Sequence, residues 1–234
     1  MKKDVIIALD FSSKKEALDF LDLFPKNERP YVKIGMELFY AEGPEVIREI
    51  KSRGNKIFLD LKLHDIPNTV EKAMTVLSAL DVDMVNVHAA GTKKMMRAAL
   101  RGLTRDDGSR PLLLGVTQLT STDQQRLEDD ILIKDDINDV IIKYAKNVKE
   151  SGLDGVVCSP LESSEIHGEC GRDFLTVTPG IRFAESDIGD QSRITTPREA
   201  GRIGSDFIVV GRPITNADDP VKAYEKCVSD FLGK

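Results

Sequence analysis

A short stretch in the first third of the chain places three charged residues at spacings that suit acid–base chemistry. Residues 57–69 read Ile-Phe-Leu-Asp-Leu-Lys-Leu-His-Asp-Ile-Pro-Asn-Thr. Alternate side chains of a strand share a face, so Asp60 and Lys62 point to one side and the neighbouring leucines to the other. Burying both ions costs several kcal/mol each unless they are well paired. With Asp65 following, just before a helix-opening Pro67, this pattern indicates a catalytic strand end.

Other charged residues occur in two earlier strand-like runs. Asp10 closes the first run, and Lys33 lies inside the second. A buried ion network that only holds the fold together is the alternative, because structural networks also bury charge. Two lysines and three aspartates from three strands favour a functional site, since Val or Leu would generally stabilise a core better than buried ions do.

Two glycine–arginine segments near the C-terminus have the composition of an anion site. They are Thr178-Pro179-Gly180-Ile181-Arg182 and Val210-Gly211-Arg212-Pro213. Glycine lets backbone amides approach an anion closely, and arginine can bind phosphate oxygens in a bidentate manner. Either segment alone could be an ordinary turn with a solvated arginine. Together they predict a phosphorylated small molecule as the ligand.

The elements that position these residues alternate between strand and helix patterns. Apolar runs predict eight strands, at residues 5–9, 31–35, 56–60, 84–88, 111–117, 155–158, 174–178 and 207–210. Helical spacing predicts helices at 14–23, 45–53, 69–80, 93–103, 138–151, 198–203 and 221–232, with a shorter one at 161–167. This alternation implies a parallel sheet with helical crossovers. We therefore predict a (β/α)8 TIM barrel that forms a single catalytic domain over residues 1–234.

An open, doubly wound sheet is the other arrangement that this alternation allows, but no Gly-x-Gly-x-x-Gly follows the first strand. In a barrel, catalytic groups come from the carboxyl ends of strands, and phosphate binds after strands seven and eight. The charged residues and the glycine–arginine segments occupy these places. Two loops are long: 121–136, in which we expect a short helix, and 180–195, which could serve as a lid.

Composition and charge exclude several classes of function. A net charge of −6 and a pI near 5.3 argue against nucleic acid as the main partner. The apolar runs are far shorter than a membrane span requires. Charges in the first residues make a signal peptide unexpected. The three cysteines are widely spaced and form no Cys-x-x-Cys pair, so we expect reduced thiols in a cytoplasmic protein.

The three histidines give weaker signals. We expect His167 to be solvated at a helix end and His64 to have a structural or supporting role, while His88 could serve either function or packing. No grouping of His, Asp and Glu has the spacing of metal ligands, so no metal is predicted. Thr120 and Ser121, after the fifth strand, could bond a ligand amide or cap the next helix.

The motifs together resemble those of the orotidine 5′-phosphate decarboxylase family. The signature is Asp60-x-Lys62-x-x-Asp65-Ile66-Pro67-x-Thr69. The resemblance extends from Ile7-Ala8-Leu9-Asp10 and Val32-Lys33-Ile34-Gly35 to the two glycine–arginine segments. Asp-x-Lys-x-x-Asp alone is shared with sister sugar-phosphate enzymes, but the Ile-Pro-x-Thr continuation and the two loops make the match specific.

The resemblance implies a reaction: decarboxylation of orotidine 5′-monophosphate to UMP, the last step of de novo pyrimidine biosynthesis. Lys62 would donate the proton that replaces CO2 at C6 of the pyrimidine. Asp60 and the partner subunit's Asp65 would flank Lys62 and the leaving carboxylate, and Lys33 would complete an alternating row of charges. No metal or organic cofactor is implied.

The resemblance also implies how the substrate is held. Asp10, Lys33 and the partner subunit's Thr69 would bind the ribose hydroxyls, so the active sites would be shared within a homodimer. Thr120 would contact the pyrimidine amide, although Ser121 is an alternative. Gln191 would bridge the base and the phosphate as a lid closes. The phosphate end would be formed by Pro179, Arg182, Gly211 and Arg212.

Two competing functions have to be weighed. A metal-dependent sister enzyme would act on a keto-hexulose phosphate through an enediolate, and it would need carboxylates free to hold Mg2+. The lysines and the Ile-Pro-Asn-Thr continuation speak against it. A barrel that only binds nucleotides is the second alternative, and the intact Asp60, Lys62 and Asp65 speak against that.

Overall fold

The chain forms a closed barrel of eight parallel strands surrounded by helices. The computed structural model describes residues 3–183 and 195–234. Each strand pairs with the next in chain order, and β8 closes the barrel on β1. The predicted TIM barrel is therefore confirmed. The strands are β1 Asp4–Ala8, β2 Tyr31–Gly35, β3 Ile57–Leu63, β4 Met84–His88, β5 Leu112–Val116, β6 Gly155–Val157, β7 Leu175–Thr178 and β8 Phe207–Val210.

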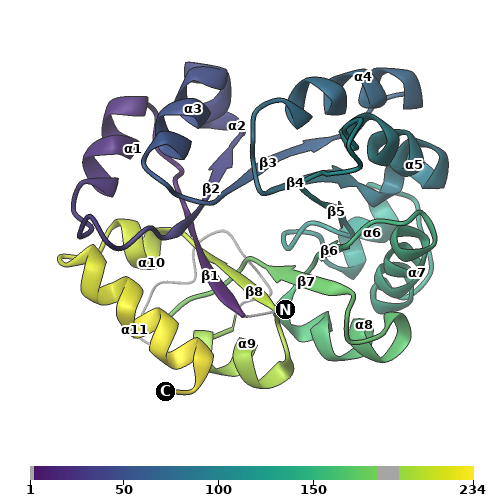
Figure 1. The fold of residues 1–234 in the computed structure, drawn as a ribbon. Helices are drawn as coiled ribbons and strands as arrows, with labels where there is room; N and C mark the ends of the chain where they lie inside the picture. Colours follow the sequence, from purple (N-terminus) through teal and green to yellow (C-terminus); the bar gives the residue numbers. More distant parts are fainter. Residues whose placement is uncertain (1–2, 184–194) are drawn as a thin grey trace.

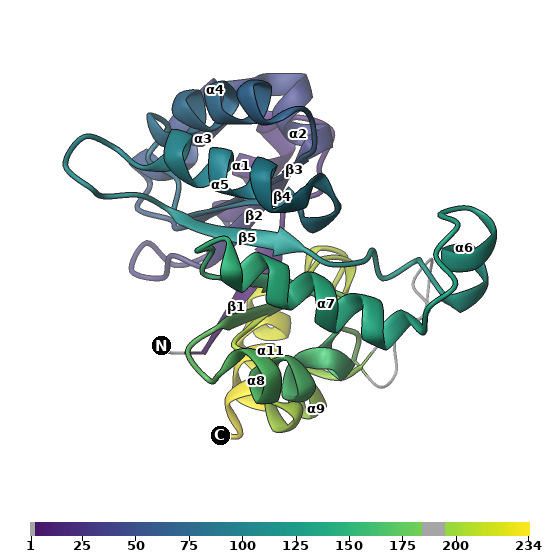
Figure 2. The same cartoon turned by 90° about the vertical axis from the view of Figure 1, so that its right-hand side faces the viewer.

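Helices ring the barrel, as Figure 1 shows. They are α1 Lys14–Leu21, α2 Met36–Glu42, α3 Pro44–Ser52, α4 Pro67–Ser78, α5 Thr92–Leu103, α6 Gln124–Asp129, α7 Ile137–Glu150, α8 Ser163–Cys170, α9 Pro197–Ile203, α10 Arg212–Thr215 and α11 Pro220–Leu232, with single 3-10 turns at Ala89–Gly91 and Pro160–Glu162. Figure 2 shows α6 standing away from the barrel, in the loop where a short helix is predicted.

Two elements depart from the sequence pattern in an informative way. Helix α2 is not predicted, because it follows β2 directly and buries only Leu38, which leaves no apolar periodicity to detect. Helix α4 begins at Pro67, two residues before the predicted start, because proline is well accommodated in the first turn. This start keeps Asp65 and Ile66 in the loop between β3 and α4.

The apolar core has two parts. The larger part lies between the strands and the helices and includes Ile34, Leu59 and Val85. The smaller part fills the barrel interior and includes Tyr31, Phe58 and Met84. Since successive residues of a strand face opposite sides, every strand except β7 contributes to both parts; the residues of β7 outside the interior part are Thr176 and Thr178. The barrel is therefore packed at its centre, and a cavity can form only at an end.

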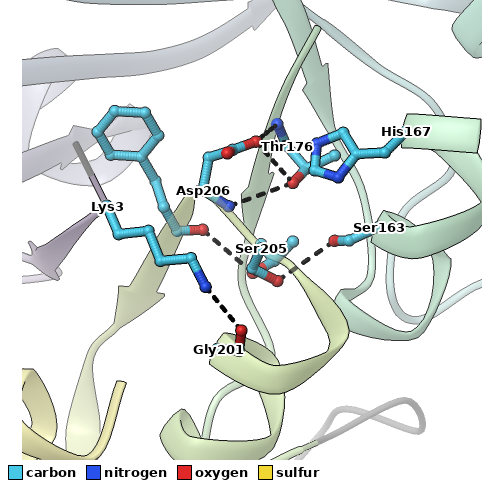
Figure 3. Close-up of polar contacts among 9 residues, drawn as sticks. Lys3, Ser163, His167, Thr176, Gly201, Ser205 and Asp206 are labelled. Atoms are coloured by element: carbon cyan, nitrogen blue, oxygen red, sulfur yellow. Dashed lines mark hydrogen bonds and ion pairs between the residues drawn. The ribbon is translucent and has the colours of Figure 1, made fainter. Parts of the chain in front are cut away.

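The prediction for His167 is wrong. This residue lies in the last turn of α8 but is buried, and its Nε2 lies 3.1 Å from Asp206 Oδ2. The same carboxylate oxygen accepts a hydrogen bond from the Thr176 amide at 2.8 Å. Figure 3 shows this group at the amino ends of β7 and β8. The pattern of the helix could not reveal the burial, because Asp206 is 39 residues away in the chain.

The three cysteines are buried free thiols, as their spacing predicts. Within the described residues, no helix is long and apolar enough to cross a membrane.

Candidate active site

A cavity of about 520 Å³ opens at the carboxyl ends of the strands. Its size suits a small-molecule ligand. Nine of the residues predicted for the site line it: Asp10, Lys33, Asp60, Lys62, Thr120, Pro179, Arg182, Gly211 and Arg212. They come from segments that are far apart in the sequence, and the barrel closure brings them together. Ser121 also lines the cavity, so the geometry leaves the choice between Thr120 and Ser121 open.

Four charged side chains form a row of alternating sign along one wall. Lys33 Nζ lies 2.8 Å from Asp10 Oδ1 and 3.6 Å from Asp60 Oδ2. Lys62 Nζ lies 2.7 Å from Asp60 Oδ1. Of the two carboxylates in this row, Asp60 is more enclosed than Asp10, with 8% of its surface exposed. The row matches the alternating charges that the family resemblance implies.

The Asp60 carboxylate is held ionised by its neighbours. Burial alone would raise its pKa, but Lys33 and Lys62, together with hydrogen bonds from Lys62 and Asn86, outweigh that effect and hold the pKa below its usual value. Asp60 therefore carries its negative charge at neutral pH. A fixed negative charge beside Lys62 keeps the ammonium aimed into the cavity.

The backbone of β3 is irregular where it positions Lys62. Lys62 has φ of 53°, in the left-handed region that side chains disfavour. The pairing of β3 with β4 shifts register between Leu59 and Leu63. Asp60 and Lys62 do line the same cavity, but through an irregularity rather than the regular alternation that the sequence suggests. Such irregularities re-aim side chains next to functional sites.

Asn86, on β4, is a site residue that the sequence reasoning missed. Its amide donates to Asp60 Oδ1 at 2.7 Å and accepts from the Lys62 backbone N–H at 2.8 Å. It is almost completely buried. The available signal was a polar residue inside the apolar run Met-Val-Asn-Val-His, the same kind of signal that identified Asp60 and Lys62.

The rest of the cavity lining combines an apolar surface with the two glycine–arginine segments. Val116, Val157 and Val209 provide the apolar surface. Gly180 has φ of 82°, a conformation that favours glycine. The loop after β7 returns to the barrel at residue 195, where the Arg182 amide donates to the Thr195 carbonyl at 3.0 Å.

The second glycine–arginine segment and its neighbour meet at the same place. Gly211 directly follows β8, and Arg212 begins the short helix α10. Arg182 is 9% exposed and lines the cavity with Arg212. Loops after the seventh and eighth strands are where barrels of this type bind phosphate. A partly apolar small molecule that carries a phosphate suits these lining residues.

Two of the predicted residues that the structure describes do not line the cavity of their own chain. Asp65 and Thr69 are exposed at the β3–α4 connection and at the start of α4, and neither lines the cavity. Gln191 lies outside the described residues. The positions of Asp65 and Thr69 leave them accessible to a second molecule.

The two remaining histidines lie beside the charged wall. The rings of His64 and His88 have centroids 5.6 Å apart. Burial, followed by the nearby His64 and Lys62, lowers the pKa of His88. Neither ring lines the cavity, and His64 is exposed. Across residues 3–183 and 195–234, no group of three or more His, Cys, Asp or Glu is arranged to hold a metal ion.

Comparison with known proteins finds relatives that are similar over the full chain. A family model described as "Orotidine 5'-phosphate decarboxylase / HUMPS family" matches residues 3–227. A Bacillus cytotoxicus protein named orotidine 5'-phosphate decarboxylase is 54% identical over 100% of this chain and 99% of its own length. The crystal structure of orotidine 5'-phosphate decarboxylase from Lactobacillus acidophilus has a TM-score of 0.88 and 42% identity, covering 99% of this chain and 100% of that one.

A second solved structure, an uncharacterized conserved protein from Geobacillus kaustophilus, has a TM-score of 0.86 and 45% identity, covering 97% of this chain and 99% of that one. Fold, motif positions and full-length similarity therefore lead to one assignment. The chain belongs to the orotidine 5′-phosphate decarboxylase family.

Proposed function

We propose that this cavity is the site at which the protein decarboxylates orotidine 5′-monophosphate to UMP, with Lys62 as the proton donor. The activity follows from family membership, since the 54% identity to a curated decarboxylase extends over the whole chain. The observation that carries the assignment of roles is the row Asp10–Lys33–Asp60–Lys62, whose last member is an ammonium paired at 2.7 Å inside the cavity.

The reaction needs an ammonium at this place. Loss of CO2 from C6 leaves a carbanion in the plane of the ring, where the π-system cannot delocalise it well. An ammonium already fixed beside that carbon stabilises the charge through a prearranged field and then transfers a proton. At a separation of 4 Å and an effective dielectric constant of 20, this attraction is worth about 4 kcal/mol.

That contribution is a fraction of the ~8–23 kcal/mol by which enzymes typically lower a barrier. The rest would come from binding the phosphate and ribose, which holds the base in a desolvated place. Arg182 and Arg212 would bind the phosphate, with Pro179 and Gly211 shaping that end of the cavity. Asp10 and Lys33 would bind the ribose hydroxyls, and Thr120 or Ser121 would contact the pyrimidine amide. Gln191 would bridge base and phosphate.

We also propose that the protein acts as a homodimer with shared sites. Asp65 and Thr69 are required by the family signature but lie outside the cavity of their own chain. Their exposure supports a role in the neighbouring subunit's site, where the partner subunit's Asp65 would face the substrate carboxylate. Two functional residues with no place in their own cavity are otherwise unexplained.

The charge pairing disfavours the metal-dependent sister reaction. A divalent cation would need carboxylate oxygens that are free of other cations. Both oxygens of Asp60 face lysines, and the Asp10 carboxylate faces Lys33. The named decarboxylases among the curated relatives agree with this choice.

We further propose that residues 1–234 form one catalytic domain that works without a cofactor. We also propose that the protein acts in the cytoplasm, because free buried thiols are stable there.

The test is a direct assay of the wild-type protein and two variants. We expect orotidine 5′-monophosphate absorbance to fall on adding wild-type protein, with no effect of EDTA. Lys62→Ala should abolish turnover while still binding UMP, and Lys15→Ala, which changes a lysine on the surface of α1, should behave as wild type. Normal turnover by Lys62→Ala would refute the role of Lys62. UMP binding by wild-type protein without any turnover would instead support a barrel that only binds nucleotides.

A further inference from the structure

Asn86 is the one buried side chain that bonds both to the Asp60 carboxylate and to the backbone of Lys62 among the described residues. It lies in the middle of β4 and is 1% exposed. A buried amide in an apolar strand is costly unless its hydrogen bonds are made. Here both polar atoms of the amide make hydrogen bonds, one to Asp60 and one to Lys62, the last two members of the charged row.

The hydrogen bond between Asn86 and the Lys62 amide supports an unusual backbone conformation. Lys62 has φ of 53°, a conformation that its side chain disfavours and that persists only where the surroundings hold it. The β3–β4 pairing is shifted at this place. The Lys62 N–H donates to Asn86 Oδ1 at 2.8 Å. The Asn86 side chain therefore takes the place of a regular strand partner where the strand departs from regularity.

The hydrogen bond from Asn86 to Asp60 orients the Asp60 carboxylate. Asn86 Nδ2 donates to Asp60 Oδ1 at 2.7 Å, and Lys62 Nζ approaches the same oxygen at 2.7 Å. The other oxygen, Oδ2, faces Lys33 at 3.6 Å. Two donors on Oδ1 fix the rotation of the carboxyl group. With the amide removed, the carboxylate can rotate and the ammonium can follow it.

We propose that Asn86 is a positioning residue for decarboxylation, which holds the Lys62 backbone and the Asp60 carboxylate so that the ammonium points at the reacting carbon. The proposal rests on the roles proposed above for Lys62 and Asp60. Asn86 does not touch the substrate in this view, because it does not line the cavity. Its effect should therefore be on the chemical step more than on substrate binding.

The first test compares two buried asparagines. Asn86→Ala should lower kcat by about 10²-fold, the effect of a small misplacement of a reacting group, while KM changes little because the groups proposed to bind ribose and phosphate remain. Asn55→Ala is the matched control: Asn55 is also buried, and its side chain donates to the Pro30 carbonyl at 2.9 Å at the other end of β3. It should lower thermal stability and leave kcat unchanged.

The second test uses Asn86→Asp, which preserves the shape of the side chain. Two adjacent carboxylates cannot both ionise readily, so the pair should hold one shared proton up to a raised apparent pKa. With that proton, the new carboxyl can donate to Asp60 and accept from the Lys62 amide as asparagine does. The variant should therefore keep much of its kcat at the acidic end of the pH profile and lose it as the pH rises, at a lower pH than wild type does.

The outcomes separate this proposal from the one on which it rests. If Lys62→Ala has normal turnover, the proposed function of Lys62 fails and the argument for Asn86 fails with it. If Lys62→Ala is inactive but Asn86→Ala keeps wild-type kcat, or Asn86→Asp has a wild-type pH profile, only the role of Asn86 is refuted. If Asn86→Ala does not fold, the isosteric Asn86→Asp and its pH profile decide.

Discussion

At the scale of single residues, the site depends on charges that stabilise one another inside the barrel. Asp60 is buried, yet Lys33 and Lys62 hold its pKa below the usual value. A carboxyl whose pKa is lower in the folded state contributes stability above the pKa of the unfolded chain, and this contribution is lost as pH falls through the folded pKa. Asp60 therefore keeps its negative charge, and with it its pairing to Lys33 and Lys62, down to pH values below the usual pKa of a carboxyl group.

Adding a methyl group at Gly35, at the end of β2, tests how closely the charged row of Asp10, Lys33, Asp60 and Lys62 is packed. A Cβ placed at this position would lie 3.1 Å from Lys33 Nζ and 3.3 Å from Asp10 Oδ1. The backbone there is ordinary extended chain, with φ of −89°, so alanine strains nothing else. We expect Gly35→Ala to displace the ion pair by a few tenths of an ångström and to lower kcat/KM by roughly tenfold. Steady-state kinetics measures this.

The control for this change is Gly168→Ala, in α8. A Cβ at Gly168 would meet no atom within 4 Å, and alanine is the better helix former. This variant should keep wild-type kinetics with equal or higher thermal stability. Wild-type kcat/KM in Gly35→Ala would contradict the prediction and show that the Lys33–Asp10 pair can shift without consequence.

At the scale of elements, the same stabilising arrangement of an aspartate occurs at three places at the amino end of the barrel. Three aspartates, each just before an even-numbered strand, accept the amide of a residue at the start of the preceding strand and pair with a basic side chain. They are Asp83 with Ile57 N–H and Lys51, Asp154 with Leu113 N–H and Arg110, and Asp206 with Thr176 N–H and His167. The arrangement cannot be recognised in the sequence, because the partners are distant in the chain.

Replacing Asp206 tests whether the amino end of the barrel contributes to stability without affecting activity at the carboxyl end. Asp206→Ala would leave the Thr176 amide and the buried His167 without their shared partner, so we expect a loss of about 2–3 kcal/mol in the free energy of unfolding. Because the cavity lies at the other end of the strands, kcat should stay at the wild-type value. Urea unfolding and the decarboxylation assay measure the two effects. Asp173→Ala, an exposed aspartate before β7, should change neither.

Some features of the elements can be predicted from the local sequence, and others cannot. The strands and most helices follow from apolar periodicity, and Asp60 and Lys62 were visible as charges within an apolar run. The left-handed backbone of Lys62 and its bond to Asn86 depend on the shifted register between β3 and β4. The burial of His167 depends on Asp206. The sequence shows Asn86 as a polar residue in an apolar run, but the partner in each of these two pairings cannot be read from the local pattern.

At the scale of the whole molecule, the barrel assembles one cavity from both ends of the chain but leaves two signature residues outside it. The cavity extends from Ala8 to Arg212 in sequence. Asp65 and Thr69 are exposed, and next to Asp65 lies Ile66, with 66% of its surface exposed. Val76, also on α4, is 63% exposed. Exposed apolar residues beside polar signature residues suit a surface that meets a second subunit.

Mixing two inactive variants tests whether the sites are shared. In a heterodimer of Lys62→Ala and Asp65→Ala chains, one cavity would combine an intact Lys62 with the partner subunit's intact Asp65, so one site would work. After random subunit exchange at equal amounts, we expect about one quarter of wild-type activity. Lys62→Ala mixed with Asp60→Ala is the control, because both losses lie in the chain's own cavity and every site stays defective. If the first mixture stays as inactive as the control, Asp65 does not act across a dimer.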